Sequence, residues 1–218
     1  MLVKIEVWSD VVCPWCYIGK RRLDRAIERF EHADEVEVVW RSFQLDPTYP
    51  KGVRRPVYTH LAEKMGSSVA QVRAMTDRVA SLAAEEGLVY DFDRSVLVNT
   101  VDAHRVSHLA KAHGLGGQMH ERLLRAHLME GETLDDVETL VRLAVEVGVP
   151  ATEVRRVLAG DEYAADVVED GREAQVLGAN GVPFFVLDRR YGVSGAQPVE
   201  VFESALRTAY EHAGAAAG

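Results

Sequence analysis

Both cysteines of the chain lie in one segment, Ser9-Asp10-Val11-Val12-Cys13-Pro14-Trp15-Cys16-Tyr17-Ile18-Gly19-Lys20. The residues before it, Leu2 to Trp8, alternate as in a short strand. After Cys16, apolar residues recur at the spacing of an amphipathic helix, at positions 18, 23, 26, 27 and 30. Pro14 fits the first turn of that helix, where its missing N–H leaves no bond unmade. The sequence therefore predicts a strand, a turn and a helix that begins at Cys13.

The place of Cys13 at the helix start favours redox chemistry. Unsatisfied N–H groups and the helix dipole stabilise an anion there, and the thiolate is the reactive form of cysteine. Cys16 lies three residues later and is predicted to point back into the first turn, where it is shielded. An exposed nucleophile and a covered resolving thiol are what dithiol exchange requires.

Two other interpretations of the cysteine pair remain, a zinc site and inert core cysteines. Structural zinc usually takes four ligands, and the chain has no further cysteine. His104 and His108 are one helical turn apart, but they lack the glutamate of the zinc hydrolase motif. We expect the remaining histidines to face solvent; they are His32, His60, His113, His120, His127 and His212. No metal site is predicted.

A second characteristic segment lies near the far end, Gly181-Val182-Pro183-Phe184-Phe185-Val186-Leu187. Phe184 to Leu187 form an expected buried strand, followed by a turn and a second strand over 191–195. Proline is tolerated at the start of a strand, because its missing donor falls at the end of the ladder. The sequence by itself favours a trans bond, since only about 5–6% of X–Pro bonds are cis.

The order of these elements resembles the thioredoxin superfamily, and Val182-Pro183 resembles the valine–proline pair of its DsbA branch. The resemblance implies that Pro183 is cis and packs against the dithiol, and that the backbone before it pairs with bound peptide. Pro14, Trp15 and Val182 would then tune the reduction potential of the cysteine pair.

Within that branch the cysteine segment is similar to FrnE-like proteins, which are described as polyketide-biosynthesis dithiol–disulfide isomerases. Three further segments carry the same likeness: Phe43-Gln44-Leu45-Asp46-Pro47, Asn99-Thr100-Val101-Asp102-Ala103-His104-Arg105 and Val193-Ser194-Gly195-Ala196-Gln197-Pro198. Some FrnE-like proteins have an additional C-terminal cysteine pair. This chain has none, which excludes a relay between two motifs.

The predicted fold class is α/β, a thioredoxin fold whose central mixed β-sheet is flanked by helices. A large all-helical insertion separates its βαβ and ββα halves. Residues 1–48 and 170–218 would form the thioredoxin-like domain, with a second strand at 36–40 and a last helix at 199–212. Residues 49–169 would form the insertion, with helices near 56–64, 69–86, 101–112, 115–129, 137–147, 154–158 and 162–177.

The insertion would lie over the dithiol as a lid, and three polar residues are candidates for the cleft beneath it. Asp10 could accept a proton from Cys16, although capping the turn is the favoured interpretation. Asn99 is also a good helix cap, and His104 could be a half-exposed helical residue.

Composition limits the partners and the compartment. The net charge is −9, which argues against a nucleic-acid or membrane-surface protein, because phosphate binding needs clustered cations. The chain start lacks a signal peptide and no apolar run approaches ~18 residues. We therefore expect a cytoplasmic protein whose dithiol rests reduced, which favours reductase or isomerase work. The sequence does not indicate an oligomeric state.

The resulting hypothesis is a thiol–disulfide oxidoreductase or isomerase that acts through mixed disulfides, with Cys13 as nucleophile and Cys16 as resolving thiol. Its substrate would be a protein or small molecule with a thiol or disulfide. No cofactor would be tightly bound, but glutathione or another thiol could serve as reducing co-substrate. The alternatives are a glutathione-dependent isomerase or transferase of the 2-hydroxychromene-2-carboxylate isomerase or kappa type, which usually has serine at the motif, and a non-catalytic binding module.

Overall fold

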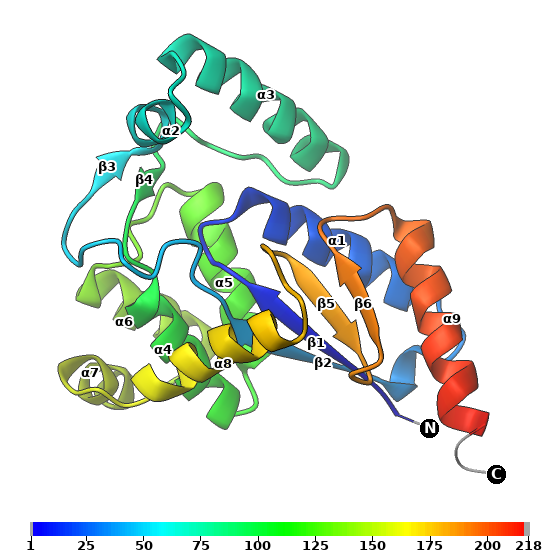
Figure 1. Ribbon diagram of the computed structural model, residues 1–218. Helices are drawn as coiled ribbons and strands as arrows, with labels where there is room; N and C mark the ends of the chain where they lie inside the picture. Colours follow the sequence, from blue (N-terminus) through cyan, green and yellow to red (C-terminus); the bar gives the residue numbers. More distant parts are fainter. Residues whose placement is uncertain (1, 216–218) are drawn as a thin grey trace.

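The strand before the cysteines is β1 (Val3–Ser9), an inner strand of a four-stranded sheet with the order β2-β1-β5-β6. β1 runs parallel to β2 (Val36–Ser42) and antiparallel to β5 (Phe184–Leu187), which pairs antiparallel with β6 (Tyr191–Ser194). The sheet is therefore mixed, and Figure 1 shows helices on both sides of it. The predicted α/β fold class is confirmed.

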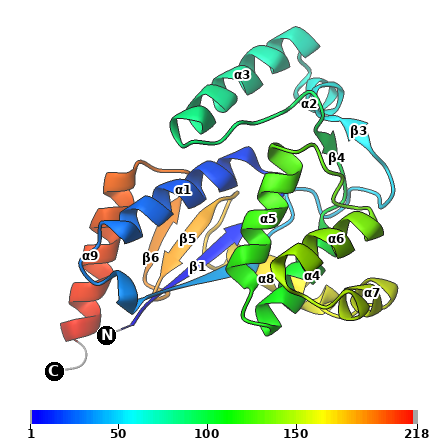
Figure 2. The ribbon, with the colours of Figure 1, turned by 180° about the vertical axis from the view of Figure 1, so that it is seen from behind.

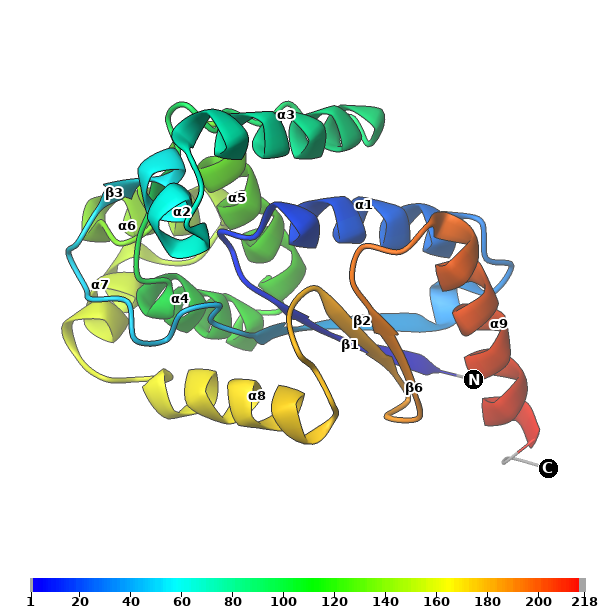
Figure 3. The ribbon, with the colours of Figure 1, turned by 45° about the horizontal axis from the view of Figure 1, so that its top comes forward.

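Alternation along β1 decides which helices cover which face, since successive side chains of a strand point to opposite sides. Val7 and its odd-numbered neighbours pack against α1 (Pro14–Glu28) and α9 (Val199–Ala215). Trp8 packs on the other face, against α8 (Ala164–Val176). Figure 3 shows α1 and α8 on opposite sides of the sheet. This arrangement fixes the start of α1 at the end of β1.

A helical insert joins β2 to α8, and Figure 2 shows its two groups of helices. One part, α2 and α3, lies over α1, while α4 to α7 form a second group with its own apolar core. A ladder of two residues on each strand, β3 with β4, interrupts the otherwise helical segment. The elements of the insert are β3 (Arg55–Pro56), α2 (Val57–Met65), α3 (Val69–Glu85), β4 (Val96–Leu97), α4 (Val101–Ala112), α5 (Gly116–Leu128), α6 (Val137–Val147) and α7 (Ala151–Ala159). A short 3-10 turn, η1 (Ala33–Glu35), lies ahead of β2 and outside the insert.

Most predicted helix starts lie within two residues of the observed ones. Ser68 forms a capping box with Gln71 at the start of α3, and Asp136 caps α6. The predicted start of α7 at residue 154 is wrong, because Pro150 initiates the helix three residues earlier. The expectation that His120 and His127 face solvent is also wrong. Both are buried, because α5 is wedged between the sheet and the rest of the insert.

The computed structural model describes residues 2–215, so residues 1 and 216–218, at the ends of the predicted thioredoxin-like domain, lie outside the described residues. None of the helices in this range is long and apolar enough to cross a membrane. Nor do three His, Cys, Asp or Glu side chains within it gather where they could hold a metal ion.

Candidate active site

Cys13 is the residue that precedes α1, at the point where the chain leaves β1 through a tight turn. Its backbone N–H donates to the carbonyl of Asp10 at 3.1 Å, and its own carbonyl accepts from the N–H of Cys16 at 3.1 Å. Pro14 occupies the first helical turn, as predicted. The sulfur of Cys13 thus lies beside the positive end of the helix dipole.

Both thiols are free; Cys16 is covered, as expected, but Cys13 is more enclosed than expected. Cys13 is only 5% exposed, so the prediction of an exposed nucleophile is wrong, while Cys16 is 1% exposed. Helices of the insert cover the two cysteines: α2, α3 and α5 share one apolar cluster with them. Burial raises the pKa of the Cys16 thiol well above its ordinary value, and the neighbouring Cys13 sulfur adds to the effect. Cys16 is therefore held as the protonated partner.

The Val182–Pro183 peptide bond is cis, as the resemblance implies, and it lies against the dithiol. The Cys13 thiol donates to the Val182 carbonyl with a sulfur–oxygen distance of 3.7 Å. On the other side of the bond, the Pro183 carbonyl accepts from the N–H of Gly195 at 2.8 Å. Cys13 and Val182, which are 169 positions apart in the sequence, are thereby in contact.

Two tyrosines beside the dithiol were not predicted. The Tyr90 hydroxyl donates to the Pro14 carbonyl at 2.6 Å, and its ring stacks on Tyr17 with a centroid distance of 6.4 Å. Burial raises the pKa of Tyr90, with a further contribution from the nearby Cys13 and Cys16. Tyr90 follows α3 in an irregular segment, and no helical or strand pattern marks such a residue as facing the site.

The three cleft candidates have structural partners. Asp10 is buried, and its carboxylate accepts from the N–H of Leu45 at 2.8 Å and lies 3.2 Å from Nε2 of His104. The favoured interpretation of the Asp10 side chain as a cap of the turn is therefore wrong, since only its backbone carbonyl closes that turn. His104 is 2% exposed rather than half-exposed. Asn99 donates to the Tyr49 carbonyl and accepts from the N–H of Val101, the first residue of α4, although the N-cap position itself is held by Thr100 and not by Asn99 as expected.

This combination of fold and site has known counterparts. Residues 4–207 match the family of DSBA-like thioredoxin domains. The chain belongs to that family. The DSBA-like chain is 48% identical to the probable DsbA oxidoreductase SCO1869 from Streptomyces coelicolor, whose crystal structure has a TM-score of 0.93 over 96% of this chain and 90% of that one.

The chain also matches two further proteins. The uncharacterized protein YwbO of Bacillus subtilis is 29% identical over 212 residues, which is 94% of this chain and 96% of that protein. A 2-hydroxychromene-2-carboxylate isomerase has a TM-score of 0.69 at 14% identity, over 96% of this chain and 98% of that one. At that identity the likeness concerns the DSBA-like fold alone.

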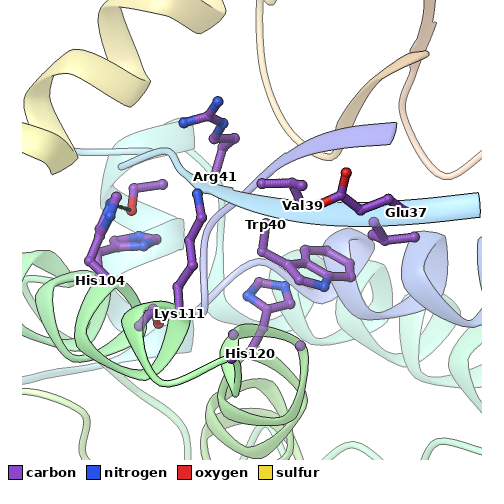
Figure 4. A pocket seen from close by; sticks show the side chains of 14 residues that line it. Glu37, Val39, Trp40, Arg41, His104, Lys111 and His120 are labelled. Carbon is purple, nitrogen blue, oxygen red and sulfur yellow. Dashed lines mark hydrogen bonds between the residues drawn. The ribbon is translucent and has the colours of Figure 1, made fainter. Parts of the chain in front are cut away.

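Two cavities of the DSBA-like chain are lined by side chains of the insert. One, of about 230 Å³, follows the outer edge of β2 and is closed by α4 and α5. Figure 4 shows His120 stacked under Trp40, with Lys111 and His104 on the neighbouring helix. The other cavity, of about 320 Å³, has Pro14 and Trp15 of the cysteine motif in its wall. The second cavity is the one beside the dithiol.

Buried His127, on the wall of that second cavity, should make the stability of the DSBA-like fold depend on pH. Burial lowers its pKa to about 4, against an ordinary value near 6.5, although Asp10 opposes the shift. Between these values the unfolded chain binds a proton that the folded chain does not. Stability therefore falls as the pH falls, by about 2 kcal/mol between pH 7 and pH 5.

Urea unfolding at both pH values measures this effect, and His127→Phe is the matched variant. The variant should lose less stability than the wild-type chain over the same interval, by about the stated amount. Equal losses in the two proteins would contradict the assignment.

Proposed function

We propose that this DSBA-like protein exchanges disulfides with thiol- or disulfide-containing substrates through the Cys13–Cys16 dithiol. The observation that carries the proposal is the asymmetry of the pair. Cys13 lies at the positive end of α1 against the Val182 carbonyl, whereas Cys16 is buried and held protonated. The membership of the family and the 48% identity to a probable DsbA oxidoreductase support it.

In the reducing direction the Cys13 thiolate attacks one sulfur of a substrate disulfide. A mixed disulfide forms and the other substrate sulfur leaves as a thiolate, which takes up a proton. Cys16 then loses its proton and attacks the Cys13 sulfur, so the intramolecular disulfide forms and the second substrate sulfur is released. The substrate gains two electrons and two protons. Two molecules of a thiol such as glutathione return them to the protein and are themselves joined as a disulfide.

A more specific function is proposed from the resemblance of the cysteine segment to FrnE-like proteins. We infer a FrnE-like member that works in the cytoplasm as a reductase or isomerase, with glutathione or another thiol as co-substrate. Tuning of the reduction potential falls to Pro14, Trp15, Val182 and Pro183, of which Val182 accepts a hydrogen bond from the Cys13 thiol. The presence of both cysteines favours this function over glutathione-dependent isomerisation, which needs no resolving thiol.

Reduction of insulin and of hydroxyethyl disulfide by glutathione tests the proposal, and refolding of scrambled ribonuclease tests the isomerase role. We expect the protein to accelerate at least one of the two reductions several-fold over a variant in which both cysteines are serine. If neither reduction is faster than with that variant, the proposed function is wrong.

A further inference from the structure

Ser9 ends β1 with its side chain directed toward α1. Side chains alternate along a strand, and Val7 of the same strand packs against α1, so Ser9 shares that face. Ser9 is 0% exposed. Cys16 lies in the first turn of α1 and is buried as well, and Figure 3 shows α1 along one side of the sheet. The strand and the helix thus bring the Ser9 hydroxyl to the resolving thiol.

The Ser9 hydroxyl has no nitrogen or oxygen partner among residues 2–215. Its hydrogen bond goes to sulfur instead, because the Ser9 hydroxyl and the backbone N–H of Asp10 both bond to Cys16. Most buried polar atoms of proteins have a partner, and a neutral cysteine sulfur is a weak one. Hydrogen bonds to an ionised acceptor are stronger. The bond from Ser9 therefore strengthens when Cys16 loses its proton.

The surroundings of Cys16 otherwise oppose its ionisation. Burial raises the pKa of its thiol and the Cys13 sulfur adds to this effect, whereas the hydrogen bonds from Ser9 and Asp10 lower the pKa. From the insert, Tyr90 faces the two sulfurs, and burial keeps its hydroxyl neutral at pH 7.

The Asp10 side chain is engaged elsewhere. Its carboxylate accepts from the N–H of Leu45 and lies beside Nε2 of His104, so Asp10 reaches Cys16 through its backbone N–H. Of the side chains that bond to the Cys16 sulfur, Ser9 is therefore the one that favours the thiolate.

We propose that Ser9 is a catalytic residue of the resolving step and that its hydroxyl donates a hydrogen bond to the Cys16 thiolate. The inference rests on the proposed function, because this step belongs to exchange through both cysteines. The Cys16 thiolate attacks the Cys13 sulfur of the mixed disulfide, and the bond between the two cysteines forms. The bond from Cys13 to the substrate breaks, the substrate sulfur leaves with the electron pair, and the Cys16 proton passes to water. Ser9 keeps its own proton throughout.

Stopped-flow absorbance of the reduced protein with dithiobis(nitrobenzoate) separates the two attacks. The first nitrothiobenzoate is released by Cys13 at a rate proportional to the reagent concentration. The second is released by Cys16 at a rate that does not depend on that concentration. Ser9→Ala should slow the second release about three- to tenfold at pH 7, since it removes one hydrogen bond to a charged atom. The first release should change less than about twofold, because Cys13 depends on the start of α1 and on Val182.

The pH dependence distinguishes this role from a merely structural one. The difference between Ser9→Ala and the wild-type chain should shrink toward pH 10, as hydroxide replaces the help that Ser9 gives to the ionisation of Cys16. A disturbed fold would instead slow the release at both pH values.

Ser42→Ala is the matched control, because Ser42 pairs with Ser9 across β1 and β2 and is 3% exposed, but its hydroxyl lies 3.1 Å from Nε2 of His108. It should leave both releases unchanged. An unchanged second release in Ser9→Ala, an equal loss at pH 7 and pH 10, or an equal loss in Ser42→Ala would overturn the role of Ser9 and leave the proposed function intact. Absence of a second release from the wild-type chain would instead refute the proposed function, and the inference with it.

Discussion

Replacement of the second cysteine, Cys16→Ser, is expected to stop turnover and to leave Cys13 covalently joined to its substrate. In the proposed mechanism the wild-type chain releases the substrate by an attack of Cys16 within the same helical turn, where this thiol has a high effective concentration. The variant depends on an external thiol instead, so turnover should fall by about two orders of magnitude or more. Mass spectrometry after acid quenching would detect the mixed disulfide.

The reciprocal variant, Cys13→Ser, provides the contrast. It should be equally inactive but form no adduct, because the buried and protonated Cys16 is a poor first nucleophile. Equal adduct formation in the two variants would contradict the assigned order of attack. Full turnover by Cys16→Ser with glutathione would instead support the glutathione-dependent class.

The residues to which the order of attack by Cys13 and Cys16 is assigned could be predicted from the sequence, since they form local patterns. Cys13 and Pro14 follow a strand and precede an amphipathic helix, so their place at the helix start depends on neighbours in the chain. The proline of the second segment is different. Its cis bond, and the contact of the preceding Val182 carbonyl with Cys13, followed from a family resemblance, because a non-local contact leaves no periodic signal.

The surroundings of the dithiol could not be predicted for the same reason. Tyr90 reaches Pro14 from 76 residues away, and His127 faces a cavity formed by four separate elements of the insert. A helical pattern shows which face of α5 is apolar but not what that face packs against. His120 and His127 therefore resembled surface histidines, although burial between the sheet and the insert makes both neutral.

Gly19→Val should destabilise the fold by about 3 kcal/mol and slow disulfide exchange, because it separates α1 from the Val182–Pro183 bond. A Cβ atom at Gly19 would lie 2.9 Å from Cγ of Pro183 and 3.2 Å from the Phe185 ring. Neither neighbour can yield easily, since the proline ring is stiff and Phe185 is packed on Phe202 with a centroid distance of 4.8 Å. Overpacking of this kind typically costs about 1–3 kcal/mol, and valine adds two further methyl groups.

Gly171→Val is the control for Gly19→Val. It separates the effect of steric overlap from the effect of a changed helix propensity. Gly171 lies within α8 and a Cβ atom there meets no neighbour within 4 Å, so valine should change stability by less than about 0.5 kcal/mol. Urea unfolding gives the stabilities, and the rate of a first mixed disulfide on each variant reports the sulfur's environment. The Cys13 thiol donates a hydrogen bond to the carbonyl of Val182, the residue before Pro183. Displacement of Pro183 in the Gly19 variant should therefore change the rate at which the first mixed disulfide forms. An unchanged rate, with Gly19→Val folded, would mean that the contact between sulfur and carbonyl does not govern the reactivity of Cys13.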